Sequence, residues 1–570
     1  MKHNGMVVVA LALGLVACKK DTGDKGAPGK QPVRTSLPPE LTRRPAGVDT
    51  TKLAVPPLFA YVPADTAYLI GSFEPIPLEY FDKMFTKIGP AVSKALDQLG
   101  DQVSDPQGVA LIDAIRSELD GKWSVAGVES LGLSAQPHFA IYGLPVVPVV
   151  ARMDVKDDKA VLATIQRIAA KAGRTLPAPE TRGSTTFWKL VKDKSTFVVS
   201  LGDDQLVLAV GPTDLVEQKL GLVLGTEKPA AASDGKALEQ VMADHGYAPY
   251  IVGFLDSKRF LDDVVTMARA DKTEDNPPSD VCAGELQRLA GRAPKLVLGY
   301  EELTLKRQTM SFEVELAPDL LAELSALRTQ VPGLGTALSN QPLMAFGGGI
   351  DLAGAQRFLI AAMQSWNKAY VACNMGKDKG KVDLSDAIAS VSKPMPPELA
   401  QITGGVATVQ DVAFGPGGPL PDRIDGFLLV TATDAKALYA ALLKQQPKLA
   451  ALGIATDGKL HELPKGRLPM PFVINAGVGD HAFAVGVGAT GKTLGEQMLG
   501  ASGGGPVPFL AFTYDYGRLI DLSMQVKRMQ GKTDPTDDLN KALSELFSRG
   551  NMTLDTNAKG LALWTSLDMK

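Results

Sequence analysis

Short segments from the first half of this 570-residue chain recur in the second half in the same order. Gly202-Asp203-Asp204 in SLGDDQLVLAVG corresponds to Gly479-Asp480-His481 in GVGDHAFAVGVG, 277 residues later. Seven further pairs keep the order, with slowly changing spacings: Lys159-Ala160 with Lys436-Ala437, Gly71 with Gly347, Phe81 with Phe358, Asp113 with Asp386, EQKLG with EQMLG, PYIVGFLDSKRFLDDV with PFLAFTYDYGRLIDLS, and LQRLAGRAPKLVL with LSELFSRGNMTLD. The series predicts a diverged duplication, with one unit over residues 56–335 and the second over 336–570. The alternative is coincidence between similar helix and strand patterns.

The pattern of apolar residues predicts strands and amphipathic helices within each unit. Residues 160–172 have apolar side chains at helical spacing, and residues 196–211 form two apolar runs around the Gly202-Asp203-Asp204 turn. Further hairpins are predicted at 295–304 with 309–316 and at 552–556 with 561–567. Because hairpins pair antiparallel strands, the predicted fold class is α+β. Each of the two units is expected to have helices packed on an antiparallel sheet.

The N-terminus predicts export and lipidation. An apolar run of 11 residues, Met6 to Val16, follows Lys2 and His3 and is too short to span a bilayer. It ends in Leu15-Val16-Ala17-Cys18, which resembles the bacterial lipobox. The resemblance implies a signal peptide over 1–17, diacylation of Cys18 and anchoring in the cell envelope. The alternative is an ordinary secretory signal with an incidental cysteine.

The residues after the lipobox bear on sorting and reach. Lys19 rather than Asp follows Cys18, which by resemblance to enterobacterial sorting favours the outer membrane, facing the periplasm or the cell surface. Residues 18–55 have few apolar side chains and are expected to form a flexible tether of about 30–35 Å. No other run reaches 18 apolar residues, so no transmembrane helix is expected.

Three cysteines are present, and lipidation of Cys18 would leave two. In an oxidising compartment we expect Cys282 and Cys373 to form a disulfide across the boundary between the units. The alternative is two free, buried thiols.

The first strand follows the segment Tyr61-Val62-Pro63-Ala64-Asp65-Thr66. This opening resembles a family of uncharacterised bacterial lipoproteins that begin with such a segment after the tether. The resemblance implies the two-unit layout and no particular activity. Pro63 and Asp65 are also suited to a turn that leads into a strand over 67–73.

Composition excludes one class of partner. The net charge is −4 and the pI is about 5.9, so the basic surface of a nucleic-acid-binding protein is not expected.

Three short motifs match enzyme patterns, and each has a simpler interpretation. Residues 486–493, GVGATGKT, fit a phosphate-binding loop, but an exported protein meets little ATP, and Thr493 with Glu496 could form a capping box. Ser502 lies in GASGG, where a helix is expected before it and a strand after it, the reverse of a nucleophile elbow. Ser390 and Lys393 fit SxxK, but Pro394 argues against a helix that carries both.

The five histidines have no metal-ligand spacing among themselves or with cysteine, so neither a metal nor a cofactor is expected. We therefore expect a non-enzymatic, membrane-anchored envelope lipoprotein that binds a protein partner or an apolar ligand, or has a structural role. The alternative is an exported hydrolase whose active site no motif reveals. A deep apolar cavity would point to a carrier of lipid or another hydrophobic ligand, and a cleft with a Ser/His pair or a perturbed carboxylate would favour the second.

Overall fold

The computed structural model describes residues 37, 38, 41, 48–102, 105–183, 185–270, 277–373, 384–414, 421–464, 472–531 and 536–570. The described residues form helices and nineteen strands that belong to one sheet. Every pair of neighbouring strands is antiparallel, so the predicted α+β class is confirmed.

The strands of the first half are β1 (Tyr68–Gly71), β2 (Phe139–Gly143), β3 (Val149–Asp154), β4 (Glu180–Arg182), β5 (Thr185–Lys192), β6 (Ser195–Gly202), β7 (Gln205–Pro212), β8 (Val252–Asp256), β9 (Lys295–Leu303) and β10 (Arg307–Glu315). Those of the second half are β11 (Met344–Gly349), β12 (Ile402–Phe414), β13 (Pro421–Ala432), β14 (His461–Glu462), β15 (Ile474–Val478), β16 (Ala482–Val487), β17 (Leu510–Asp515), β18 (Phe547–Thr556) and β19 (Gly560–Met569).

The order of strands is the same in both halves, apart from the additional edge strand β4 of the first half. From its outer edge to the middle of the sheet, the first half runs β4-β5-β6-β7-β3-β2-β1-β8-β9-β10. The second half runs β14-β15-β16-β13-β12-β11-β17-β18-β19. The two meet where β10 pairs with β19, from Arg307 with Asp568 to Glu315 with Gly560. A nine-residue ladder therefore joins the halves into one continuous sheet.

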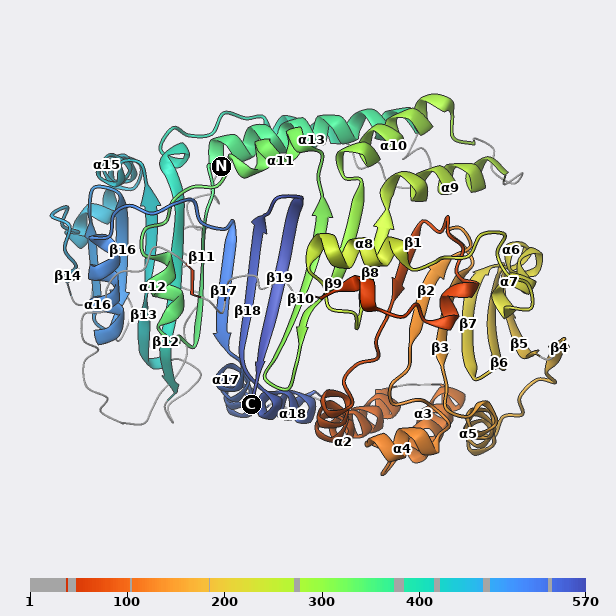
Figure 1. Cartoon of the computed structure of the whole chain (residues 1–570). Coiled ribbons are helices and arrows are strands. Elements are labelled where there is room, and N and C mark those ends of the chain that lie inside the picture. The colour runs from red at the N-terminus through yellow and green to blue at the C-terminus, as the bar shows by residue number, and fades with distance from the viewer. Residues whose placement is uncertain are drawn as a thin grey trace.

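Helices lie at both ends of the strands and on one side of the sheet (Figure 1). At one end are α2 (Leu78–Gln102), α3 (Pro106–Leu119), α4 (Val125–Ser130), α5 (Asp158–Lys171), α17 (Tyr516–Met529) and α18 (Asp537–Leu546). At the other end are α9 (Ser257–Ala270), α10 (Asp280–Arg292), α11 (Pro318–Ser325), α13 (Leu352–Ala372) and α15 (Ala435–Gln445). The side that faces the viewer has η3 (Pro57–Tyr61), α6 (Thr213–Gln218), α7 (Leu220–Leu224), α8 (Lys236–His245), α12 (Leu334–Ser339) and α16 (Gly488–Leu499). The remaining short helices are η2 (Thr50–Lys52), α14 (Leu384–Val391), η4 (Leu399–Gln401) and η5 (Pro447–Leu452).

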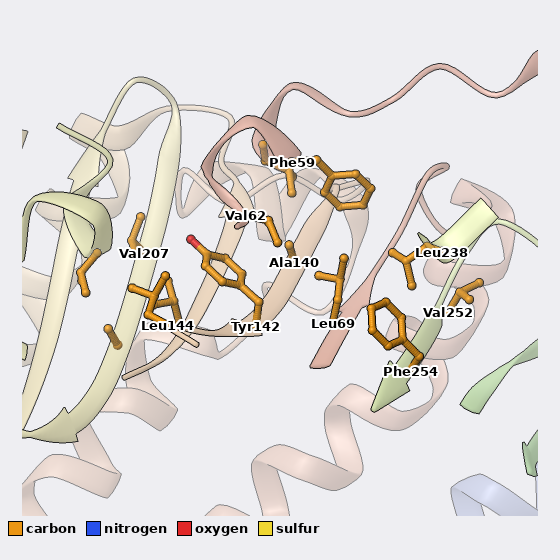
Figure 2. Packing of buried hydrophobic residues seen from close by; sticks show 14 of the residues in the cluster. Phe59, Val62, Leu69, Ala140, Tyr142, Leu144, Val207, Leu238, Val252 and Phe254 are labelled. Carbon is orange, nitrogen blue, oxygen red and sulfur yellow. The ribbon is translucent and has the colours of Figure 1, made fainter. Parts of the chain in front are cut away.

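The main cores lie between the sheet and the helices of this covered side. Figure 2 shows Phe59 and Val62, in and just after η3, above Leu69, Ala140 and Tyr142 of the first half. A second cluster lies on the same side of the other half, where Leu334 and Leu338 of α12 pack with Met498 of α16. The short helices of each half thus cover part of the strands on this side, and Leu41 of the N-terminal segment adds to the core of the second half.

Two residues of the expected tether pack on these cores. Leu41 is only 2 % exposed and belongs to the core of the second half, and Thr553 of β18 donates a hydrogen bond to its carbonyl oxygen at 3.4 Å. Leu53 packs against the core of the first half. The described part of residues 18–55 therefore includes anchored positions on both halves, so a flexible tether does not describe Leu41 or Leu53.

The other elements follow the sequence closely. The predicted helix 160–172 is α5, the hairpin 196–211 is β6 with β7, and the two later hairpins are β9 with β10 and β18 with β19. The expected division at 335/336 falls inside α12, whose residues pack in the core of the second half. Within the described ranges, every helix is too short or too polar to traverse a bilayer.

Candidate functional site: an open apolar face of the sheet

The side of the sheet opposite the covered side is apolar and partly exposed in its middle. On β10 the side chains alternate: Ser311 and Glu313 are buried on the covered side, whereas Met310 and Phe312 point the other way. Phe312 is 42 % exposed. A strand normally buries its apolar residues and exposes its polar ones, and β10 does the reverse.

This surface spans nine neighbouring strands from β2 to β11, and eight of them contribute side chains, because β8 has Gly253 in this row. We define the open face as ten apolar side chains on the same side of these strands, none of them buried: Ile70, Ile141, Leu298, Met310, Phe312, Phe346, Phe512, Met552, Leu554 and Leu563. Strand pairing places them in rows, in which Leu298 lies beside Phe312 and Phe312 beside Leu563, and in which Met552 lies beside Phe512 and Phe512 beside Phe346. At about 4.8 Å between strands, the open face from β2 to β11 is about 38 Å long.

Helices also pack on the side of the sheet that carries the open face, next to its borders. On the outer strands of the first half, Val161 and Ile165 of α5 pack against Trp188 and Leu201. On the second half, the Tyr439 ring of α15 stacks on Phe483 at 6.5 Å between centroids. At one end of the central strands, Tyr80 of α2 packs with Tyr300 and Leu567 and donates a hydrogen bond to Gln308. Helices therefore flank the open face at the outer strands and at one end of the central strands.

A hollow of about 580 Å³ lies between α2 and α4 and is lined by Leu78, Glu79, Asp82 and Val125. The amide of Val125 donates to Asp82 at 3.4 Å. No described nucleophilic side chain lines this hollow, and its charged groups are the exposed carboxylates of Glu79 and Asp82.

A buried polar cluster lies beneath the covered side at the seam between the halves. His245, at the end of α8, lies between two carboxylates, with Nδ1 3.2 Å from Glu313 and Nε2 2.9 Å from Glu315. Asn557 donates to Glu313 at 2.8 Å, and Ser311 donates to Tyr247 at 3.1 Å. His245 and Glu313 are almost fully buried, so these groups hold the seam and present no surface to a substrate.

The phosphate-binding interpretation of residues 486–493 is excluded by an internal carboxylate. The backbone amides of Thr490 and Gly491 donate to Asp425 of β13, at 3.3 and 2.6 Å. A Cβ at Gly491 would lie 1.9 Å from the carbonyl oxygen of Gly426, so helix α16 is pressed against the strand. The amides at the start of α16 therefore already bind the Asp425 carboxylate, and no space remains there for a phosphate. The capping box is also wrong, because Thr493 lies inside α16 and donates to Ala489 at 3.0 Å.

The two serine motifs are not brought together with catalytic partners. Ser502 is exposed in the loop between α16 and β17, the helix-before-strand order that the sequence predicts. Ser390 lies in α14, whereas Lys393 lies beyond the end of that helix. The pair therefore lacks the shared helix that the SxxK motif requires.

The predicted disulfide is confirmed. Cys282, in the first turn of α10, and Cys373, the residue that ends α13, are bonded with their Cα atoms 4.5 Å apart. Cys18 lies outside the described residues. Of the histidines, His481 occupies a turn before β16, as its counterpart Asp204 does before β7. In the part of the chain that the structure describes, no three His, Cys, Asp or Glu side chains are arranged to hold a metal ion.

One cluster of charged side chains could not be predicted from any motif in the sequence. Glu118 of α3 is only 4 % exposed and accepts from Arg167 at 2.7 Å, Lys122 at 3.0 Å and Lys171 at 3.1 Å. The Arg167 guanidinium, with the two lysines, lowers the pKa of Glu118 to about 2, despite the opposing effect of burial. Because all three cations are structural partners, the cluster joins α3 to α5 rather than forming a site.

Comparison with known proteins gives no relative: no family model, curated protein or solved structure matches this chain.

Proposed function

We propose that the chain is a duplicated, lipid-anchored envelope protein whose open face binds an apolar ligand or the apolar surface of a partner. The duplication is supported by the register of the sheet. Gly71 of β1 pairs with Val252 of β8, and Gly347 of β11 pairs with Ala511 of β17. The sequence repeat independently matches Gly71 with Gly347 and Val252 with Ala511. Residues equivalent by sequence are therefore also equivalent by strand pairing.

The strands on the other side of Gly71 and Gly347 show the same agreement between sequence repeat and strand pairing. In the first half, partners in successive strands lead from Gly71 through Ala140 and Arg152 to Val207. In the second, they lead from Gly347 through Val406 and Leu429 to Ala484. Val207 and Ala484 are 277 residues apart, the spacing that relates Gly202 to Gly479. A one-residue slip in any of the pairings would break this agreement, so it supports two copies of one unit.

The binding role rests on one observation, the exposed apolar floor in the middle of a sheet whose other side is fully packed. Soluble proteins rarely leave a contiguous apolar surface uncovered unless something binds to it. Phe346, at 39 % exposed, and Phe312 lie on different halves, so the surface continues across the seam. The predicted export signal and Cys18 would hold this surface near a membrane.

An enzymatic role has no comparable support. The described serines of the two motifs lack catalytic partners, and the one buried histidine between carboxylates is enclosed. The proposal is therefore a binding protein of the cell envelope, with no cofactor or metal assigned and no role in nucleic-acid binding.

The test places a photoreactive phenylalanine analogue at Phe312 in the full chain, expressed in its own envelope. Val281, which is 69 % exposed on α10, serves as the control position away from the open face. Irradiation of cells should give a mass adduct at position 312 and little at 281. If position 312 forms no adduct above the level of position 281, the open face has no resident ligand and the proposal is wrong.

A further inference from the structure

We infer that the occupant of the open face is the acyl chains of phospholipid, laid across the strands, an inference that rests on the proposed function. The first argument is polarity. The polar side chain in the middle of the open face, Thr565 between Met310 and Met552, donates its hydroxyl to the carbonyl oxygen of Met310 at 3.3 Å, and the backbone groups are paired in the sheet ladders. A polar ligand would lose its hydration here and gain no partner in exchange. A hydrocarbon chain has no hydrogen bonds with water to lose.

The second argument is shape. Helices α5, α15 and α2 pack onto the same side as the open face, at the outer strands and at the strand ends. In a face-to-face pair these helices would meet those of the second copy, whereas a flexible hydrocarbon chain can lie across the strands between them.

The third argument is length. One leaflet of a bilayer is about 15 Å of hydrocarbon, half of the ~30 Å core. The open face is about 38 Å long across nine strands, enough for two acyl chains end to end. The unbranched, adaptable side chains of Met310 and Met552 in its middle suit a ligand without fixed shape. The face is therefore long enough for the two chains of one diacyl lipid.

The source of the chains can be separated from the protein's own lipid anchor. Phospholipids contain phosphate, whereas the acyl groups expected on Cys18 do not. Cells that carry the photoreactive residue at Phe312, Phe346 or Val281 are grown with radioactive phosphate and irradiated, and the full-length protein is isolated under denaturing conditions. We expect labelled protein from positions 312 and 346, at least fivefold above position 281.

Each other outcome rejects the phospholipid assignment. An unlabelled adduct that contains a second polypeptide would show a protein partner, and one of twice the chain's mass would show a second copy; both leave the binding role of the open face intact. The absence of any adduct at 312 and 346 would reject both proposals. Equal labelling at 281 would mean nonspecific contact with the membrane.

A second measurement guards against a perturbed fold. Phe312→Asp and Phe346→Asp each introduce a charge on the open face at an exposed position, and Val281→Asp does so elsewhere. Native mass spectrometry of the three full-length proteins should show phospholipid bound to the Val281→Asp protein and at least fivefold less on the other two. Equal occupancy in all three, with circular dichroism unchanged, would reject the open face as the lipid site.

Discussion

Cys282 and Cys373 join the beginning of α10 to the end of α13, so the only disulfide among the described residues connects the two halves of the chain. Helices α10 and α13 lie together at one end of the strands (Figure 1). The halves are also joined by the β10–β19 ladder. The bridge therefore reinforces an existing connection rather than providing the sole one.

Removing the bridge should weaken the fold without separating the halves. The double variant Cys282→Ser with Cys373→Ser loses a cross-link that closes a 91-residue separation, worth about 4.6 kcal/mol in the chain-entropy model before any strain is subtracted. Urea unfolding of wild type and variant should show a lower midpoint. Alkylation of unreduced, denatured wild type should label neither thiol, and labelling of both would contradict the disulfide.

Glu118 should make stability depend on pH in the acid range. Its pKa is about 2 in the folded protein against an ordinary 4.5, so the unfolded state binds more protons between these values. The stabilisation is complete above pH ~4.5 and is lost as the pH falls toward 2. Because Arg167 and Lys171 are half exposed and therefore screened, we expect Glu118→Gln to cost about 2 kcal/mol at pH 7 and much less at pH 3.

Urea unfolding at pH 7, 5 and 3 measures the Glu118 effect. Glu129→Gln is the matched control, since its ion pair with Lys156 is on the surface and should contribute less than about 0.5 kcal/mol. A Glu118→Gln cost that is the same at pH 7 and pH 3 would contradict the assigned charge cluster.

Asp425 should act as a structural cap for α16. Asp425→Ala leaves the amides of Thr490 and Gly491 without their acceptor and should lower the free energy of unfolding by about 1–2 kcal/mol. Lys492→Ala, in the same motif, should leave stability unchanged. Isothermal titration with MgATP should give no heat for the wild type; saturable binding that Lys492→Ala abolishes would instead support a phosphate-binding loop.

Cys18 should determine where the protein is found. With Cys18→Ser we expect the chain to remain unprocessed or to leave the membrane fraction, because no acyl group can be attached. Cell fractionation and mass spectrometry of the mature N-terminus measure this. A wild-type N-terminus at a residue other than 18 would show that Leu15 to Cys18 is not a lipobox.

The secondary structure and the disulfide could be predicted because their signals are local or compositional. The Gly202-Asp203-Asp204 turn is an example: Asp203 and Asp204 both adopt positive φ, as a tight hairpin requires, and the apolar runs beside them are β6 and β7. Cys282 and Cys373 were the two cysteines left after Cys18 in an exported chain. Neither prediction needed long-range geometry.

The candidate site could not be predicted, because strand alternation does not say which side is covered. In β10 the sequence RQTMSFEVE alternates clearly, and the usual rule would place Met310 and Phe312 inside and Ser311 and Glu313 outside. The structure reverses this. His245, Tyr247 and Asn557, all distant from β10 in the sequence, supply polar partners for Ser311 and Glu313 on the covered side.

The central claim is that the open face holds lipid, and bound phosphorus tests it most directly. The measurement is the phosphorus content per mole of full-length protein isolated from its own membranes and depleted of free lipid, for wild type and for Phe312→Asp combined with Phe346→Asp. We expect at least one phosphorus per wild-type chain and at least fivefold less in the double variant, with equal recovery of folded protein. The same phosphorus content in both, or none in the wild type, would contradict the claim.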